Sequence, residues 1–263
     1  MLEVKEISKT FNAGTINEKK ALSKLSLTLE EGDFVTVIGG NGAGKSTLLN
    51  AVAGVFGVDE GGIFIEGTDV TRLPEYKRAK FLGRVFQDPM NGTAATMGIE
   101  ENLALAYRRG NARTLRWGIR AQERKMYAEK LKELDLGLET RLTSKVGLLS
   151  GGQRQAITLL MSALQRPKLL LLDEHTAALD PKTAHKVLEI TQNIVTRDRL
   201  TTLMITHNMN HAIAYGNRLI MMHNGRIIFD VSGEEKKSLK VEHLLQKFTE
   251  LSGDTASDRM MLS

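Results

Sequence analysis

FVTVIGGNGAGKSTLLN, residues 34–50, is the stretch that decides the fold of this chain. FVTVI (34–38) is a short β-branched run that predicts a fully buried strand, and residues 45–53 predict a helix that Gly54 closes. Between them lies a glycine-rich turn with the spacing GxxxxGK[ST]. Such a turn can be purely structural, but a strand before it and a helix after it are the context in which the spacing indicates a phosphate-binding loop.

The chemistry expected of this loop follows from its backbone. Glycines let the chain fold around an anion with its N–H groups pointing inward, and the N-terminus of the following helix adds a favourable dipole. We expect Lys45 to reach the β- and γ-phosphates of a nucleotide and Ser46 to offer its hydroxyl to Mg²⁺. The predicted nucleotide-binding residues of the loop are Gly39, Gly40, Asn41, Gly42, Ala43, Gly44, Lys45, Ser46 and Thr47.

A second element, KLLLLDE at residues 168–174, ends in two acids. Its four leucines predict a buried strand, and Asp173 follows at the carboxyl end, where open α/β sheets bind their ligands. We expect Asp173 to hold the water shell of Mg²⁺ and Glu174 to polarise an attacking water. A strand that ends in two acids is common by itself, but together with the glycine-rich loop it strongly indicates a nucleotide site.

The third element, LSGGQ at residues 149–153, is the most specific motif of the chain. Ser150 is a sound N-cap for the helix that follows, and Gly151 and Gly152 leave backbone N–H groups open to an anion. A lone SGG would indicate only a capped helix. Because the chain already contains one phosphate-binding loop, a second anion-binding helix end suggests a site that another copy completes.

Strands alternate with helices along most of the chain, which predicts an α/β protein with a mainly parallel sheet. Leu25, Leu27 and Leu29 alternate with polar residues and predict a half-buried strand, whereas residues 98–165 show a helical pattern that indicates an inserted subdomain. Further predicted elements are an edge hairpin at 63–70, a strand that ends at 85–87, a helix that begins at Asp180 and Pro181, a buried strand at 201–206, a hairpin at 218–230 that turns at Asn224 and Gly225, a last helix at 240–252, and a frayed end.

Composition excludes several classes of protein. The 263 residues, 41% hydrophobic, suffice for one well-cored domain with a subdomain insert, and the absence of cysteine excludes disulfides and thiolate metal sites. The first residues, MLEVKEISKTF, carry acids where a signal peptide needs an apolar core, so we expect no signal peptide. No apolar run approaches the roughly 20 residues of a membrane helix, so we expect a soluble chain that only a partner would carry to a membrane.

The charge of the chain is modestly basic. The net charge of +5 is spread along the sequence and does not indicate nucleic acid. The stretch 108–125 is rich in arginine and favours a solvated helix face, with a partner or lipid-headgroup surface as the alternative. Its arginines are Arg108, Arg109, Arg113, Arg116, Arg120 and Arg124.

The order of GGNGAGKST, Gln87, LSGGQ, LLLLDE, AALD and His207 resembles the nucleotide-binding ATPase of ABC transporters, from about residue 2 to residue 230. The resemblance implies a P-loop NTPase fold of the RecA-like type, with N-terminal antiparallel β elements beside the parallel sheet. It also implies an ABC ATPase domain over residues 1–230, with the helical subdomain at about 88–165, and a C-terminal helix and tail over 231–263. ATP and Mg²⁺ are the implied cofactors.

The resemblance also implies roles for single residues. Gln87 is similar to the family's Q-loop glutamine, Asp180 to its D-loop aspartate at the dimer interface, His207 to its switch histidine, and Phe11 to its adenine-stacking residue. The alternatives are a polar strand end, a helix cap, a structural histidine and a core phenylalanine. The implied catalytic residues are Glu174, His207 and Gln87, the implied metal ligands are Ser46, Gln87 and, through water, Asp173, and the signature residues implied to act on a second copy are Leu149, Ser150, Gly151, Gly152 and Gln153.

One residue departs from the family pattern. The family usually has proline after the catalytic glutamate, whereas this chain has His175 in DEHTAALDP. That variant resembles a branch of importer ATPases paired with binding proteins for aromatic amino acids such as tryptophan. A neutral loop substitution is the alternative interpretation.

Three classes of function follow from the resemblance. The first is an importer ATPase, which pairs head to tail with a second copy or a related chain and drives separate membrane permeases that a substrate-binding protein serves. The second is the ATPase of an export or lipid-extraction system. The third is a non-transport relative in DNA repair or on ribosomes. The third is disfavoured, because residues 48–149 leave no room for a long coiled coil and the chain holds only one cassette.

Import and export stay open on these residues. We expect no nucleic-acid partner, a cytoplasmic location on the inner face of the cell membrane, and a permease contact within residues 88–102.

Overall fold

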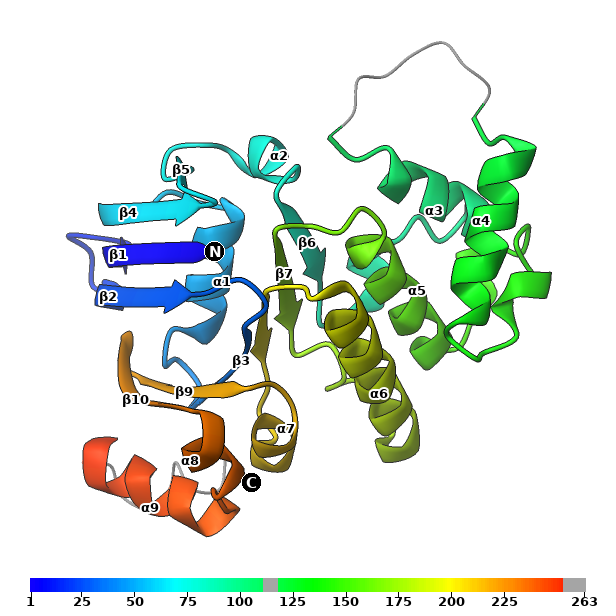
Figure 1. The fold of residues 1–263 in the computed structure, drawn as a ribbon. Helices are drawn as coiled ribbons and strands as arrows, with labels where there is room; N and C mark the ends of the chain where they lie inside the picture. The colour runs from blue at the N-terminus through cyan, green and yellow to red at the C-terminus, as the bar shows by residue number, and fades with distance from the viewer. Residues whose placement is uncertain (111–117, 253–263) are drawn as a thin grey trace.

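The computed structural model describes residues 1–110 and 118–252. It contains a four-stranded antiparallel sheet and a six-stranded sheet that is mainly parallel, with helices on both faces of the latter (Figure 1). This is the predicted α/β architecture. The strands are β1 (Leu2–Phe11), β2 (Lys19–Leu29), β3 (Phe34–Gly39), β4 (Glu60–Ile65), β5 (Thr68–Asp69), β6 (Leu82–Val85), β7 (Leu169–Asp173), β8 (Thr202–Ile205), β9 (Arg218–His223) and β10 (Arg226–Ser232). The α-helices are α1 (Lys45–Ala53), α2 (Glu75–Arg78), α3 (Ile99–Tyr107), α4 (Ala121–Lys132), α5 (Gly151–Ala163), α6 (Pro181–Asp198), α7 (Met209–Ala214), α8 (Gly233–Lys237) and α9 (Val241–Ser252), and the 3-10 helices are η1 (Pro89–Gly92), η2 (Leu138–Thr140) and η3 (Val146–Leu148).

The antiparallel sheet has the strand order β2-β1-β4-β5. It contains the strand predicted from the alternating leucines, now β2, and the predicted edge hairpin, now β4 and β5. The sequence pattern did not reveal β1. Its alternation of buried residues breaks near Glu6, which has a φ of 44° and lies at an irregularity in the pairing with β2.

The larger sheet has the strand order β10-β9-β3-β8-β7-β6. Its pairs are parallel except for the hairpin of β9 and β10. Every residue of β3 is buried, as FVTVI predicts. Val37 on β3 lies in register with Ile205 on β8, and Ile205 with Asp173 on β7. The carboxyl ends of these strands therefore meet at one edge of the sheet.

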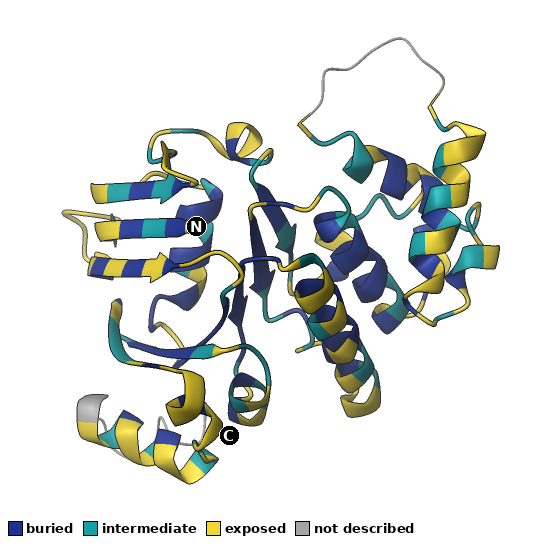
Figure 2. Cartoon of the chain, in the orientation of Figure 1, coloured by how far each residue is buried: buried dark blue, intermediate teal, exposed yellow. Residues whose placement is uncertain are grey.

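The two faces of the parallel sheet belong to different cores, and Figure 2 shows its central strands as buried. Leu169 and Leu171 pack in the same core as α1 and the antiparallel sheet, whereas Leu170 and Leu172 pack with α5 and α6. Successive side chains of a strand point to opposite faces, so the two helices lie on opposite sides of the sheet. The helix after the glycine-rich loop and the helix after LSGGQ are therefore separated by a layer of buried strands.

The region 98–165 is helical in its described part, as predicted: it contains α3, α4 and α5, with η2 and η3 between α4 and α5. The arginine-rich stretch is not the single solvated face that was expected, because Arg108 and Arg109 at the end of α3 are half-buried. Arg113 and Arg116 lie outside the described residues, and so do residues 253–263, for which a frayed end was predicted. Strand β6 ends at Val85, before Gln87, which is exposed in the following loop.

The last third of the chain follows its local signals. Asp180 caps α6 by accepting the Thr183 N–H at 3.1 Å, and the hairpin turns at Asn224 and Gly225, both with positive φ. The predicted last helix is α9, whereas α7 and α8 are too short for the pattern to reveal. None of the helices in the described ranges is long and apolar enough to cross a membrane.

Candidate active site

The glycine-rich loop joins β3 to α1 in a conformation that its glycines permit. Gly39 has a φ of 153°, and a Cβ there would lie 2.3 Å from the Met222 carbonyl oxygen of β9. Gly44 caps α1 with a φ of 101°, and a Cβ there would lie 2.6 Å from the Ala21 carbonyl oxygen of β2. Larger residues would clash with the two neighbouring strands, so the loop can lie this close to the sheet only with glycine at both positions.

A pocket of about 450 Å³ lies over this loop. It collects residues that are far apart in the sequence and that come from β1, β2, the loop, α1, and the ends of β7 and β8. Its lining is Phe11, Lys19, Ala21, Asn41, Gly42, Ala43, Gly44, Lys45, Ser46, Thr47, Glu174 and His207. The structure thus brings most of the predicted nucleotide-binding residues together with two of the three predicted catalytic residues.

Lys45 is buried at the floor of this region, with 5% of the residue exposed. Its ammonium donates hydrogen bonds to the Gly39 and Gly40 carbonyl oxygens at 2.7 Å and 3.1 Å. Burial lowers the pKa of Lys45, and the carboxylates of Glu174 and Asp173 oppose that effect. The Lys45 ammonium therefore interacts electrostatically with two acids at this end of the sheet.

Glu174 and His207 form a second contact in the pocket. His207 Nε2 lies 2.5 Å from Glu174 Oε1, and the Glu174 N–H donates to the Ile205 carbonyl oxygen at 3.1 Å. Glu174 has a φ of 47°, an uncommon conformation for a residue with a side chain. The turn at the end of β7 thus directs this carboxylate toward the residue that follows β8.

Asp173 and Gln87 do not line the pocket, which differs from the expectation that the metal ligands lie together. Asp173 is half-buried at the end of β7, and its Oδ2 lies 3.5 Å from an Arg84 guanidinium nitrogen. Burial raises the pKa of Asp173, and Arg84 opposes that effect. Gln87 is exposed in the loop after β6.

The donor set expected for Mg²⁺ consists of the Ser46 hydroxyl, the Gln87 amide oxygen and the Asp173 carboxylate. All three are oxygen donors, which suits a hard cation that keeps several of its waters. In the described part of the chain, no group of three or more His, Cys, Asp and Glu residues has the arrangement to hold a metal ion by itself. The three oxygen donors therefore fit Mg²⁺.

LSGGQ begins α5 as predicted, but away from the pocket. Ser150 is exposed and accepts the Gln153 N–H at 3.3 Å, and the Gln153 side chain accepts the Ser150 N–H at 3.2 Å, which closes a capping box. Leu149 is buried just before it. None of the five signature residues lines the pocket of its own chain.

The start of α5 packs instead on the segment that contains Asp180. A Cβ on Gly152 would lie 2.1 Å from Thr183 Cγ2, and a Cβ on Gly151 would lie 3.3 Å from Leu179 Cδ2. The two motifs expected at a dimer interface, LSGGQ and AALD, are therefore neighbours in one chain.

His175, the departure from the family pattern, is buried between the pocket and α6, with 2% of the residue exposed. Its Nε2 lies 3.0 Å from Thr191 Oγ1, which itself donates to the Val187 carbonyl oxygen at 2.8 Å. Nε2 therefore carries the proton. Burial lowers the pKa of His175 to about 4, so the imidazole is neutral at pH 7.

Phe11 both lines the pocket, as expected of an adenine-stacking residue, and packs against the protein, as expected of a core phenylalanine. Its ring lines the pocket and packs edge-on against Phe56, with ring centroids 5.2 Å apart. Lys9 Nζ lies 5.7 Å from the centre of the same ring. One face of the ring is thus supported by the protein beside the loop.

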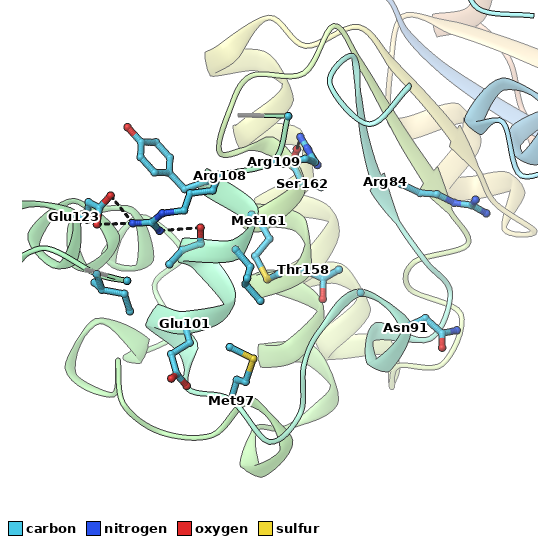
Figure 3. Close-up of a pocket in the computed structure, with 18 of the residues that line it drawn as sticks. Arg84, Asn91, Met97, Glu101, Arg108, Arg109, Glu123, Thr158, Met161 and Ser162 are labelled. Carbon is cyan, nitrogen blue, oxygen red and sulfur yellow. Dashed lines mark hydrogen bonds and ion pairs between the residues drawn. The ribbon is translucent and has the colours of Figure 1, made fainter. Parts of the chain in front are cut away.

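A second and larger cavity, of about 1470 Å³, lies between the helical region and the parallel sheet (Figure 3). We call it the subdomain groove; it is lined by residues of β6, α3 and α5 and of the segments next to them, among them Phe86, Met97, Arg109 and Met161. Arg108 at its rim pairs with Glu123, and Arg109 donates to the Ser162 carbonyl oxygen at 3.1 Å. Burial lowers the pKa of Arg109.

Sequence reasoning missed three residues of this region. Lys19 and Ala21 reach the loop from β2, and a Cβ on Gly42 would lie 3.3 Å from Lys19 Nζ. Arg84 contacts Asp173 from the neighbouring strand. Arg84 has a local signal, a charge inside an otherwise apolar strand, whereas Lys19 and Ala21 have none because the pairing of β2 is a long-range property.

Residues 22–177 match the family described as ABC transporter. The chain is 46% identical over 248 residues to the tyrosine transport ATP-binding protein of Clostridioides difficile, covering 94% of this chain and 98% of that protein. It is 36% identical over 231 residues to the methionine import ATP-binding protein MetN of Bartonella henselae, covering 87% of this chain and 64% of that protein.

A solved structure, the dimeric post-hydrolysis state of the ATP-binding cassette MJ0796 bound to ADP and Pi, is similar with a TM-score of 0.73 and 28% identity. The similarity covers 88% of this chain and 98% of that one. The family match spans the glycine-rich loop, the signature and both acids of the β7 end. The chain belongs to the ATP-binding cassette (ABC) transporter family, as one of its ATP-binding, ATP-hydrolysing subunits.

Proposed function

We propose that this chain energises the import of a small, amino-acid-like solute through separate membrane permease subunits. The ATPase part of the proposal is supported by one pocket that gathers the glycine-rich loop, Glu174 and His207. The import part is supported by the similarity, over nearly its whole length, to a tyrosine transport ATP-binding protein. A substrate-binding protein would serve the permease, and no nucleic acid takes part.

The chain works at the cytoplasmic side of the cell membrane, bound peripherally to its permease, because its ATP is drawn from the cytoplasm. We propose the division into an ABC ATPase domain over residues 1–230, with the helical subdomain at about 88–165, and a C-terminal part over 231–263. The permease contact falls within residues 88–102, of which Asn91, Gly92, Met97 and Glu101 line the subdomain groove.

The loop residues Gly39 to Thr47 bind the phosphates of ATP through their N–H groups, and Phe11 stacks on the adenine. Lys45 turns from the two carbonyl oxygens of its own loop to the β- and γ-phosphates, an exchange that the neighbouring acids favour by keeping it charged. Ser46, Gln87 and, through water, Asp173 would hold Mg²⁺, which would neutralise phosphate charge.

Glu174 acts as the general base on the attacking water, and His207, 2.5 Å from it, orients that carboxylate and contacts the γ-phosphate. Gln87 enters from the loop after β6 and orders the water. Because Glu174 is fixed by the turn after β7 and His207 by the end of β8, the parallel register of the two strands sets their spacing.

The signature residues Leu149 to Gln153 complete the site of a second chain. Their place outside the pocket of their own chain, with Ser150 and Gly151 exposed, supports a head-to-tail dimer with a second copy or a related ATPase. Asp180 and the AALD segment beside them would cross the same interface.

Uptake measurements test the proposed function. The chain is co-expressed with the permease and binding protein of its neighbouring genes in cells that lack their own aromatic amino acid uptake, and accumulation of labelled tyrosine and tryptophan is measured. We expect accumulation with the wild type and a loss of at least about 100-fold in ATP hydrolysis, with no uptake, for Glu174→Gln, which lacks the base. Accelerated loss of preloaded solute, instead of uptake, would contradict import.

A further inference from the structure

Arg84 lies on the edge strand β6 beside the strand that ends in Asp173. In the parallel pairing of the two strands, Arg84 is opposite Leu171. Its side chain is 14% exposed and that of Asp173 is 17% exposed. Figure 3 shows the Arg84 guanidinium pointing away from Arg108 and Arg109, toward the sheet side of the groove. Removing a charged group from water to this extent costs free energy unless the group is paired or hydrogen-bonded.

The guanidinium joins two parts of the nucleotide site. One of its nitrogens donates to the Asn50 Oδ1 on α1 at 2.6 Å and lies 3.5 Å from Asp173 Oδ2. Asn50 belongs to the helix that begins at Lys45, so the same group touches the phosphate-loop helix and the acid of β7. Among the described residues, Arg84 is the only cation within ion-pair distance of the Asp173 carboxylate.

Stability alone accounts poorly for this arrangement. The Arg84 Nε is buried and has no hydrogen-bond partner in the described part of the chain, and a buried ion pair often contributes less than an apolar pair of the same size. The guanidinium lies over the Phe86 ring, with its central carbon 4.5 Å from the ring centre, and this contact restricts its position. The Phe86 contact thus keeps a terminal N–H group of the Arg84 guanidinium directed toward Asn50 and Asp173.

We propose that Arg84 is a positioning residue for the metal side of the ATPase site: it holds one oxygen of Asp173 and the side chain of Asn50, and so fixes the metal-ordering carboxylate relative to the phosphate loop. The inference rests on the proposed role of Asp173 in holding the water shell of Mg²⁺. Second-sphere groups of this kind orient a ligand and leave its other oxygen free for the metal shell.

The strand that carries Arg84 also links this contact to the rest of the molecule. After Arg84 the chain continues to Phe86, which lines the subdomain groove and whose carbonyl oxygen accepts the Gln155 Nε2 at 3.3 Å. Gln155 is fully buried on α5, the signature helix. The segment formed by β6 and Phe86 therefore contacts three parts of the molecule: Asp173 through Arg84, and the subdomain groove and the signature helix through Phe86.

Nucleotide binding with and without Mg²⁺ tests the proposal. The affinity of the purified full chain for a fluorescent, non-hydrolysable ATP analogue is measured in EDTA and at increasing Mg²⁺. For Arg84→Met we expect the Mg²⁺ concentration of half-maximal effect to rise about tenfold, as for other second-sphere losses. The affinity in EDTA should stay close to the wild type. Arg84→Lys, which keeps the charge without the fork, should show a smaller rise.

Arg109→Met is the matched control, because it removes a half-buried guanidinium from the same groove without touching Asp173. It should leave both affinities unchanged. An unchanged Mg²⁺ dependence in Arg84→Met, or an equal loss of affinity in EDTA and in Mg²⁺, overturns the proposal. If Arg84→Met does not fold, Arg84→Lys decides by the same criterion.

Asp173→Asn separates this inference from the function on which it rests. If Asp173→Asn keeps the Mg²⁺ dependence of the wild type, the proposed role of Asp173 fails, and the role of Arg84 fails with it. If Asp173→Asn loses that dependence while Arg84→Met keeps it, only the inference about Arg84 is wrong.

Discussion

The glycine-rich loop and LSGGQ are both glycine-bearing N-termini of helices, and they differ in what surrounds them. The loop lies against β2 and β9, its Lys45 is buried, and Phe11, Glu174 and His207 reach the same pocket. The signature start exposes Ser150 and Gly151, is capped by Ser150, and packs on the segment that contains Asp180. A helix N-terminus is a generic anion site, and it becomes a nucleotide site only where the sheet brings other groups to it.

The largest effect should come from separating the two regions in different chains. Lys45→Ala removes the cation of the loop, and Ser150→Arg places a bulky charge on the signature. In either homodimer every site carries one defect, so trapping of nucleotide should be nearly abolished. In a mixed head-to-tail dimer one site collects both defects and the other is intact. An equal mixture should then recover about one quarter of the wild-type trapping, as random pairing of a two-fold dimer requires.

ATP-dependent dimerisation and bound nucleotide are the measurements in this mixing test, and wild-type chains carrying two distinguishable tags control for subunit exchange. A mixture that never exceeds the average of its parents, although the tagged chains exchange, means that LSGGQ serves only its own chain.

A smaller effect is expected from His175, which lies in the segment that joins the two regions. Its pKa is about 4 in the folded chain because of burial, against 6.5 when it is solvated. Between these values the unfolded chain binds more protons, so the contribution of His175 to stability is present above pH 6.5 and is lost as the pH falls toward 4. From pH 7 to pH 5 the loss should be about 2 kcal/mol in the free energy of unfolding.

His175→Gln keeps a donor for Thr191 but does not titrate, so urea unfolding of this variant at both pH values should show a flatter dependence than the wild type. Parallel curves for the two proteins would mean that the imidazole is not buried as a neutral group.

The smallest effect concerns the packing of the signature on the Asp180 segment. Gly152→Ala places a Cβ 2.1 Å from Thr183 Cγ2, and the cost of overpacking exceeds the helix propensity that alanine adds. We expect a loss of about 1–2 kcal/mol in the free energy of unfolding. In a Thr183→Ala background the nearest atom is Cβ at 3.6 Å, and the same change should cost nothing.

Gly151→Ala is the control for that cycle, since it meets only the flexible end of Leu179 at 3.3 Å. Chemical denaturation of the four proteins gives the coupling energy. Equal costs of Gly152→Ala in both backgrounds would show that Thr183 does not confine the signature helix in solution.

Much of the fold was predictable because its signals are local. The β-branched run of β3, the caps of α5 and α6 at Ser150 and Asp180, and the turn at Asn224 and Gly225 depend on residues a few positions apart. Strand β1 was missed because its alternation breaks at Glu6. The strand predicted to end at 85–87 ends at Val85, because an apolar run does not reveal where backbone pairing stops. Most of the residues that line the pocket were predictable because they belong to recognisable motifs, whereas Lys19 and Ala21 belong to none.

The sequence by itself determined where a phosphate loop, two acids and a capped glycine helix would form, since backbone conformation, helix capping and burial are encoded over short stretches. Only the tertiary structure decided which of these groups meet. The register of β3, β8 and β7 brings Glu174 to His207, the pairing of β6 with β7 brings Arg84 to Asp173, and the sheet between α1 and α5 keeps the signature from the loop of its own chain. These contacts depend on strand order, which long-range burial sets and no local pattern contains.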